Sequence, residues 1–125
     1  RDQLEAMHRL KTGALLRASA ALGGIVVGAS SVQRAALDGY AQAVGLAFQV
    51  VDDILDVTAD SARLGKTAGK DAAADKPTYV SILGLDEART LAERLRQAAH
   101  EAIAPLGAGG ARLAALADFI VLRDR

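Results

Sequence analysis

The chain has 125 residues, enough for one domain with a hydrophobic core. Its 15 basic and 15 acidic residues cancel, which excludes the basic surface typical of nucleic-acid-binding proteins. The absence of cysteine excludes a disulfide scaffold and cysteine-based metal or redox chemistry, and we expect a cytoplasmic protein. Apolar residues make up 51% of the chain and are mostly Ala, Leu, Val and Ile. Because Ala and Leu favour helices, this composition predicts an all-α fold.

The first segment predicts a helix from Asp2 to about Leu22. Apolar residues recur there every three or four positions, which is the period of a helix with one buried face. Gly23 and Gly24 are expected to break or bend this helix, and residues 25–28 are compatible with a helical continuation or an extended turn. The positions expected to face the core are Leu4, Met7, Leu10, Ala14, Leu15, Ala18, Ala21 and Leu22.

A second, longer helix is predicted from Ser30 to about Val57. Ser30 and Gln33 match a capping box, in which two side chains satisfy the unpaired N–H groups at a helix start. Gly45 lies inside this helix, where Gly costs up to about 1 kcal/mol relative to Ala, so we expect a helix or a ligand to approach closely there. The expected buried stripe is Val32, Ala36, Tyr40, Ala43, Ala47, Val50, Ile54 and Val57.

Residues 58–78 are predicted to form one long loop, and loops of this length inside a compact domain are usually functional. The later elements are a short helix over 79–83, a helix from the N-cap Asp86 to about Leu106, a flexible break at 107–110 and a last helix over 111–123. The expected inward positions of these last two helices are Ala88, Leu91, Leu95, Ala98, Ala99, Ala102 and Ile103, then Leu113, Leu116, Ile120 and Val121.

Three carboxylates and an amide share one face of the long helix. Gln49, Asp52, Asp53 and Asp56 are three or four residues apart, so they are neighbours on its surface. Clustered negative charges repel one another and oppose the helix dipole near a C-terminal end, which favours a bound cation. Mg²⁺ takes one or two carboxylates and bridges to substrate phosphates, so a magnesium–diphosphate site is predicted. A solvated acidic helix face is the alternative.

The lysines and histidines form less specific patterns. Lys11, followed by Thr12, could bind phosphate, but an exposed lysine is the more common situation. Lys66 and Lys70 lie in a glycine-containing segment that lacks the spacing of a P-loop. This segment is compatible with a flexible lid whose lysines bind phosphate and also with a solvated linker. His8 and His100 do not match a zinc-binding spacing and are expected at the surface.

The motifs together resemble those of short-chain polyprenyl diphosphate synthases, similar to bacterial farnesyl or geranyl diphosphate synthases. They are His8-Arg9-Leu10-Lys11-Thr12-Gly13-Ala14-Leu15, Gly45-Leu46-Ala47-Phe48-Gln49-x-x-Asp52-Asp53-Ile54-Leu55-Asp56, Leu64-Gly65-Lys66, Asp71 and Lys76-x-Thr78-Tyr79. No single motif is highly specific, but the motifs in combination are, and the resemblance extends over nearly the whole chain.

The resemblance implies an isoprenoid synthase fold and a head-to-tail prenyltransferase reaction. In that reaction an allylic diphosphate ionises, pyrophosphate leaves, and the carbocation alkylates the double bond of isopentenyl diphosphate. The resemblance implies that Asp52, Asp53 and Asp56 bind Mg²⁺ and that Lys11, Lys66 and Lys76 bind the diphosphate. It also implies that Thr12 and Gln49 contact the developing cation and that Phe48 lines the hydrocarbon pocket.

The chain also departs from the family pattern. It contains one Asp-Asp-x-x-Asp motif, whereas the family has two, and the arginine-rich patch for isopentenyl diphosphate is absent. We therefore expect residues 1–125 to be the C-terminal part of a single synthase domain and to be inactive alone. The basic end at Arg123 and Arg125 is expected to reach the homoallylic diphosphate, and product length is not determined by this sequence.

Two other interpretations stay open. The chain could be a non-catalytic helical module that binds or regulates a full-length synthase, or a plain helical bundle with a solvated acidic face. Terpene cyclases share the fold, but Lys11-Thr12 and Gly65-Lys66 favour the synthases. Apolar stripes on every helix predict a homodimer or higher assembly. No apolar run reaches the roughly 18 residues of a membrane span, so none is expected.

Overall fold

The computed structural model describes residues 1–62 and 76–124, apart from the side chains of residues 60–62. The described residues form helices and no strand, which confirms the all-α prediction. Lys66, Lys70, Asp71 and the family motif around Gly65 lie outside the described part of the chain. The elements are α1 (Asp2–His8), a π-helical turn (Arg9–Gly13, called the π turn below), α2 (Ala14–Val26), α3 (Ser31–Ala62), α5 (Tyr79–Leu83), α6 (Leu85–Ala102), a 3₁₀ segment (Ala104–Gly110) and α7 (Ala111–Leu122).

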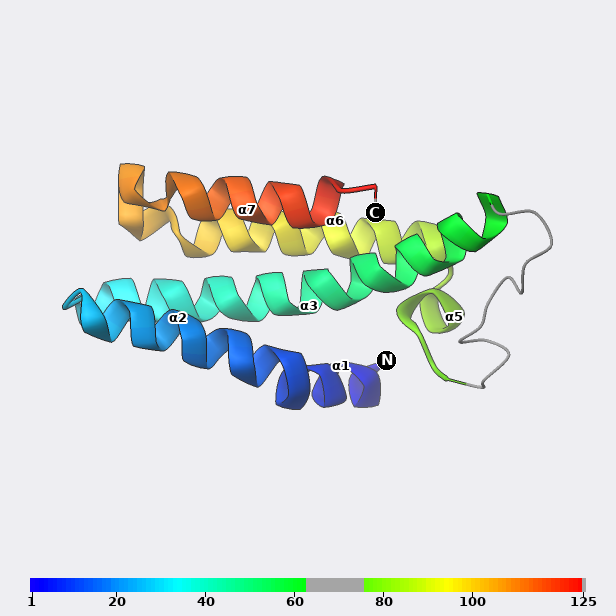
Figure 1. Ribbon diagram of the computed structural model, residues 1–125, viewed down its shortest axis with the longest axis horizontal. Coiled ribbons are helices and arrows are strands. Elements are labelled where there is room, and N and C mark those ends of the chain that lie inside the picture. Colours follow the sequence, from blue (N-terminus) through cyan, green and yellow to red (C-terminus); the bar gives the residue numbers. More distant parts are fainter. Residues whose placement is uncertain (63–75, 125) are drawn as a thin grey trace.

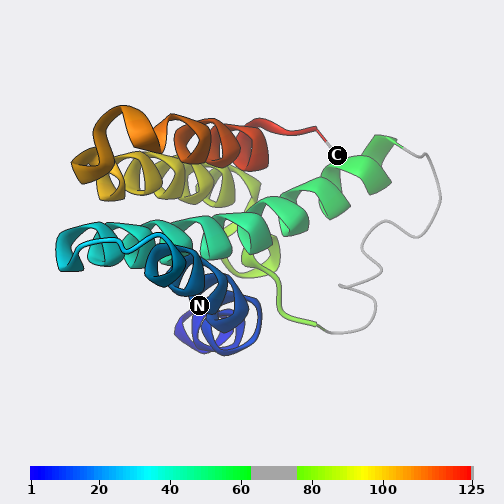
Figure 2. The same cartoon turned by 60° about the vertical axis from the view of Figure 1, so that its left-hand side comes forward.

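The long helix α3 is the centre of the molecule. It runs the length of the structure, with α1 and α2 along one side and the pair α6 and α7 along the other (Figures 1 and 2). Successive long helices run in opposite directions, as the colours in Figure 1 show. The short helix α5 packs against α3 and α6 at the end where α1 begins. The helix α3 therefore contacts helices from both the N-terminal and the C-terminal parts of the chain.

The predicted capping box at the start of α3 is confirmed. The Gln33 backbone N–H donates to the Ser30 hydroxyl at 3.2 Å, and the Ser30 backbone N–H donates to Gln33 Oε1 at 2.9 Å. These bonds satisfy two N–H groups that have no partner within the helix.

Replacing Ser30 with Ala should lower the free energy of unfolding by about 1 kcal/mol, because the Gln33 N–H loses its acceptor. Urea denaturation of the variant measures this loss. Ser31→Ala is the matched control, since Ser31 is the exposed first residue of α3 and makes none of the capping bonds. Equal effects of the two substitutions would contradict the role assigned to Ser30.

Small residues let α3 approach its neighbours closely. A Cβ atom on Gly45 would lie 3.2 Å from Leu16 Cδ1 and 3.6 Å from Gly13 Cα, so the expected close approach at Gly45 is made by another helix. On the opposite side, α6 contributes fully buried alanines, and a Cβ on Gly39 would lie 3.4 Å from Ala102 Cβ. The alanines buried between the helices include Ala43, Ala47, Ala88, Ala92 and Ala99.

The prediction for the first helix was wrong in two respects. Gly23 and Gly24 lie within α2, which continues to Val26 without a break, and a Cβ atom on Gly24 would lie 3.1 Å from Leu37 Cδ1. Of the expected inward residues only Leu4 is buried, whereas Leu10 is 82% exposed. A π turn holds more residues than an α-turn, so the faces before and after it do not align. The other expected inward positions that are exposed are Met7, Ala14, Leu15, Ala18, Ala21 and Leu22.

Other boundaries also differ from those predicted. The helix α3 continues through Ala62, where the sequence predicted a loop from residue 58. Gly84, not Asp86, is the N-cap of α6, and Asp86 lies in the first turn, where its charge favours the helix dipole. The break at 107–110 is a 3₁₀ segment in which Gly107 has a φ of 56°. Three apolar positions expected to be buried are exposed: Val32, Ala98 and Leu116.

One stretch, Ala104–Leu122, is long and apolar enough to cross a membrane by length and composition alone. The stretch was not recognised from the sequence because Arg112 and Asp118 interrupt the apolar run. The 3₁₀ segment and the left-handed Gly107 make it discontinuous as an α-helix. By itself, one such stretch is weak support for a membrane span.

Candidate functional site

A cavity of about 510 Å³ opens where α1, the π turn, α3 and the residues before α5 meet. Its wall includes four predicted site residues, Lys11, Gln49, Asp53 and Lys76, from three separate segments of the chain. We call it the polar cavity. Its remaining lining residues are Gln3, Leu4, Met7, His8, Pro77 and Thr78.

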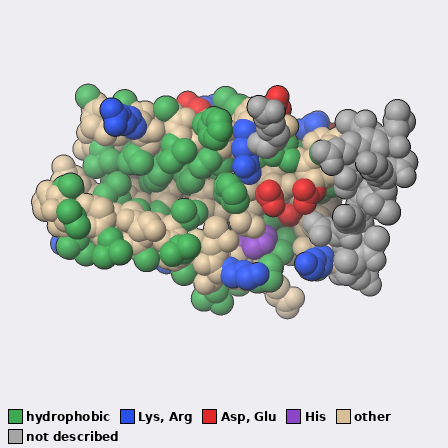
Figure 3. Space-filling view, in the orientation of Figure 1, with side chains coloured by type: hydrophobic (Ala, Val, Ile, Leu, Met, Phe, Trp, Pro, Cys, Tyr) green, Lys and Arg blue, Asp and Glu red, His purple; other side chains and the backbone are tan. Residues whose placement is uncertain are grey.

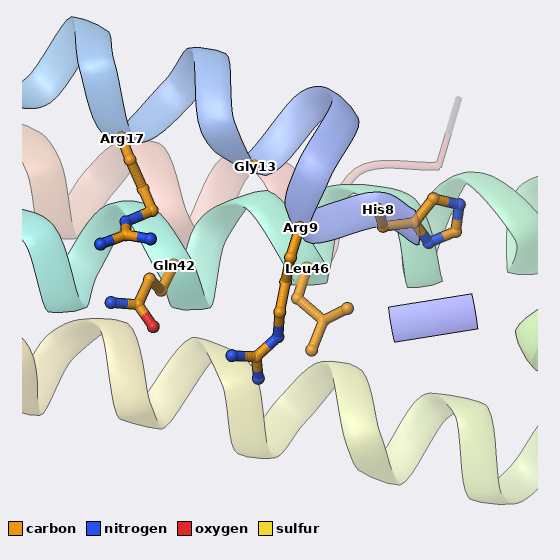
Figure 4. A pocket seen from close by; sticks show the side chains of 6 residues that line it. All are labelled: His8, Arg9, Gly13, Arg17, Gln42 and Leu46. Atoms are coloured by element: carbon orange, nitrogen blue, oxygen red, sulfur yellow. The ribbon is translucent and has the colours of Figure 1, made fainter. Parts of the chain in front are cut away.

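A second, much smaller cavity lies beside the π turn (Figure 4). It measures about 40 Å³ and is lined in part by Arg9, Arg17 and Gln42, while the His8 ring points away from Gln42. Arg17 is already paired there with Asp38 at 2.7 Å, which ties α2 to α3. A space of this size holds a few water molecules at most and is too small for a substrate, so the polar cavity is the candidate site.

The close contact of Gly13 and Gly45 positions one wall of the polar cavity. Because Gln49 is one turn beyond Gly45 on α3, it lies beside the residues of the π turn. Gln49 Nε2 donates to Thr12 Oγ1 over 3.4 Å, a long bond that places the two predicted catalytic side chains together. Lys11 lines the cavity next to them. The structure thus brings Lys11, Thr12 and Gln49 close together.

The three aspartates of α3 differ in their surroundings. Asp52 and Asp56 are exposed, whereas Asp53 is half-buried in the cavity wall. Asp53 Oδ2 accepts a hydrogen bond of 2.8 Å from the Tyr79 backbone N–H. Figure 3 shows acidic side chains gathered on the face that looks towards the viewer, with basic side chains nearby.

The carboxylates fit one mode of magnesium binding and not another. Within the described residues, no group of three His, Cys, Asp or Glu side chains lies close enough to hold a metal ion alone. A closed protein cage is therefore not formed there. Mg²⁺ commonly uses one or two carboxylates, keeps water molecules and shares substrate phosphates, and exposed carboxylates beside a lysine-lined cavity suit that arrangement.

Tyr79 and His8 form a contact that the sequence did not reveal. Tyr79 is fully buried, and its hydroxyl shares a hydrogen bond of 3.1 Å with His8 Nδ1. Burial raises the pKa of Tyr79, and burial together with the nearby Lys11 charge lowers the pKa of His8. Both side chains are therefore neutral at pH 7. His8, expected at the surface, is partly exposed, and the Tyr79 ring packs against it.

His100 is partly exposed, with 38% of its side chain open to solvent, but it is not an isolated surface residue. Its Nε2 lies 2.7 Å from Asp118 Oδ1. Arg96 Nη1 donates to the same oxygen at 2.8 Å, and this bond is the main reason that the pKa of Asp118 is lowered. The cluster joins α6 to α7 and lies outside the polar cavity.

Phe48 faces a different space from its neighbour Gln49. It lines an apolar groove of about 600 Å³ between α2, α3 and α7, together with residues such as Leu16, Val44 and Phe119. Arg123 also lines this groove, and its guanidinium carbon lies 4.6 Å from the centre of the Phe48 ring. Two buried nitrogens of Arg123, Nε and Nη2, have no hydrogen-bond partner among the described residues.

Comparisons with known proteins identify relatives of this chain. A probable farnesyl diphosphate synthase of Bradyrhizobium diazoefficiens is 58% identical over 119 residues, which are 92% of this chain and 36% of that protein. A chloroplastic geranylgeranyl pyrophosphate synthase of Catharanthus roseus is 51% identical over 124 residues, 98% of this chain and 35% of that protein. The chain thus spans about a third of the length of these relatives.

A solved structure supports the fold. The crystal structure of a protein described as a farnesyl diphosphate synthase, from Marinomonas sp. MED121, matches with a TM-score of 0.79 and 40% identity, covering 96% of this chain and 39% of that one. The predicted isoprenoid synthase fold is thereby confirmed. The sequence profile of the polyprenyl synthetase family matches residues 1–105. The match of this profile to most of the chain and the high identity to these relatives show that the chain belongs to the polyprenyl synthetase family.

Proposed function

We propose that this chain carries the metal and diphosphate half of a prenyltransferase site. The whole reaction is the head-to-tail condensation of isopentenyl diphosphate with an allylic diphosphate such as dimethylallyl or geranyl diphosphate. The observation that carries the proposal is the polar cavity, where two lysines, an amide and a carboxylate from distant segments share one wall. A plain helical bundle would not need to gather these groups.

Asp52, Asp53 and Asp56 would hold Mg²⁺ together with a substrate diphosphate. Bound Mg²⁺ supplies positive charge that stabilises the departing pyrophosphate. The exposed Asp52 and Asp56 and the cavity-lining Asp53 come from successive turns of α3, so one or two of them at a time would bind an ion whose other ligands are water and diphosphate oxygens.

The other side chains have complementary roles in this proposal. Lys11 and Lys76 line the cavity and would supply positive charge for the diphosphate. Lys66, the third lysine assigned to this role, lies outside the described part of the chain. Thr12 and Gln49 turn polar atoms towards the carbocation, whose charge such dipoles stabilise. The apolar groove beside Phe48 takes the hydrocarbon chain and excludes water from the cation.

Arg123 would bind the diphosphate of isopentenyl diphosphate. Its guanidinium lies over Phe48 at the edge of the apolar groove, with two buried nitrogens that lack a partner among the described residues. A buried donor without an acceptor costs free energy, and an anionic ligand would supply the acceptor.

We further propose that this stretch of sequence, taken alone, does not condense prenyl units, because it contains one aspartate-rich motif. A homodimer or higher assembly would cover the exposed apolar side chains of α2 and α7, which include Val26 and Phe119. A cytoplasmic location fits the absence of cysteine.

Calorimetric titration with inorganic pyrophosphate, with Mg²⁺ and with EDTA at equal ionic strength, tests the proposed half-site. We expect binding that requires Mg²⁺, because the carboxylates of α3 repel the anion until a cation lies between them. Binding that is equally tight in EDTA, or no binding in Mg²⁺, would contradict a pre-arranged half-site. Turnover of dimethylallyl and isopentenyl diphosphate by the chain would overturn the proposed inactivity.

A further inference from the structure

Tyr79 connects three segments that border the polar cavity. It belongs to the buried cluster that includes Leu4 of α1, Val50 of α3 and Ala88 of α6. Its backbone N–H donates to Asp53 Oδ2 at 2.8 Å, and its hydroxyl shares the 3.1 Å hydrogen bond with His8 Nδ1. The His8 and Tyr79 rings lie 5.4 Å apart, so they also pack against each other.

The chain just before Tyr79 is held as well. The Ser81 backbone N–H donates to the Thr78 hydroxyl at 3.0 Å, and the Thr78 backbone N–H donates to the Ser81 hydroxyl at 2.8 Å. Lys76 is only two residues further back and lines the polar cavity. The position of Lys76 relative to Asp53 therefore depends on bonds that converge on Thr78 and Tyr79.

His8 links Tyr79 to the segment that contains Lys11. It is the last residue of α1, directly before the π turn that contains Lys11, and both residues line the polar cavity. Its hydrogen bond to Tyr79 joins two neutral groups, so it adds no charge that would compete with a diphosphate for Lys11 or Lys76. The contact can hold the two lysine segments together without altering the net charge of the cavity.

We propose that Tyr79 is a positioning residue of the diphosphate site, which orients the Asp53 carboxylate through its backbone N–H and joins the Lys76 and Lys11 segments through its hydroxyl bond to His8. Hydrogen bonds to the outer side of a metal-binding carboxylate set its orientation, and their loss weakens metal binding. This inference rests on the proposed function, because it concerns the same cavity.

Tyr79→Phe is the main test, because it removes the hydroxyl and keeps the ring and the backbone N–H. We expect its Mg²⁺-dependent affinity for pyrophosphate to fall about threefold to tenfold, the scale of one lost hydrogen bond. His8→Phe should give a similar loss, and the double variant should be no worse than either, because all three lack the same bond. Losses that add up would mean that the two side chains act separately and would overturn the proposal.

Tyr40→Phe is the matched control for a merely structural effect. Tyr40 is also buried, and its hydroxyl donates to the Leu113 carbonyl at 2.7 Å, between α3 and α7. It does not line the polar cavity, and pyrophosphate has no hydrocarbon part that would enter the apolar groove. We expect a loss of stability in urea but less than about a twofold change in pyrophosphate affinity. Equal losses of affinity in Tyr40→Phe and Tyr79→Phe would overturn the proposal.

Amide hydrogen exchange separates this inference from the proposed function. The residue-79 amide should exchange slowly in the native chain and faster in Tyr79→Phe and His8→Phe, because the bond to Asp53 loosens when the side-chain anchor is removed. This measurement needs no ligand. If the native chain fails to bind pyrophosphate, the proposed function fails, whereas an unchanged exchange rate in both variants overturns the positioning role of Tyr79.

Discussion

Replacing Asp52 with Asn should reduce the Mg²⁺-dependent affinity for pyrophosphate at least about tenfold. Loss of a group that only supports a metal ligand already costs roughly 10- to 100-fold in affinity, and a lost ligand should cost no less. Asp52 is exposed, so the substitution should leave the free energy of unfolding nearly unchanged. Calorimetry with pyrophosphate and Mg²⁺ measures the affinity, and urea denaturation checks the fold.

Asp86→Asn is the control for this substitution. It makes the same chemical change at an exposed carboxylate in the first turn of α6, a different helix from the one that carries the aspartate motif. Its affinity for pyrophosphate should equal that of the native chain. Native affinity in Asp52→Asn would instead favour the solvated acidic face, for which removal of a repelling charge is neutral or stabilising.

Among substitutions that enlarge a buried side chain, Ala99→Leu is expected to cause a large loss of stability. Ala99 is fully buried and packs in a cluster with Tyr40, Ala43 and Val44, where α6 approaches α3 through small residues. Three additional carbon atoms do not fit without moving a helix, so the free energy of unfolding should fall by about 2–3 kcal/mol. That is a large share of the roughly 5–15 kcal/mol that stabilises a typical domain.

Ala98→Leu provides the comparison, because residue 98 is the exposed neighbour on the same helix. The composition changes identically, and helix propensity differs little between Ala and Leu, so the stability should change by less than about 0.5 kcal/mol. Urea denaturation of both variants gives the difference. Equal stability of Ala99→Leu and Ala98→Leu would contradict the close packing of α6 on α3 at residue 99.

Local chemistry was sufficient for much of the fold. The capping box of Ser30 and Gln33, the short helix α5 and the last helix were all predicted, because each depends on neighbouring residues. Gly45 was correctly expected to mark a close approach for the same reason, since an interior glycine in a long helix is costly unless space requires it. The spacing of the aspartates on α3 likewise follows from helical geometry alone.

Burial was predicted less well because it depends on how helices pack. The π turn shifts the face of α2, so Leu10 and Leu15 are exposed while Gly13 and Gly24 make the contacts. A periodic apolar pattern shows that one face of a helix is suited to packing, but it does not reveal a local change in helical phase.

The helices, the family and the chemical types at the site thus follow from the order of the amino acids. The tertiary structure was needed to show that Lys11, Gln49, Asp53 and Lys76 share one cavity while Phe48 faces the apolar groove. It was also needed to show that Tyr79 joins His8 to Asp53. These contacts link residues from distant segments, and their formation depends on the packing of α5 and the π turn against α3, which no local sequence pattern encodes.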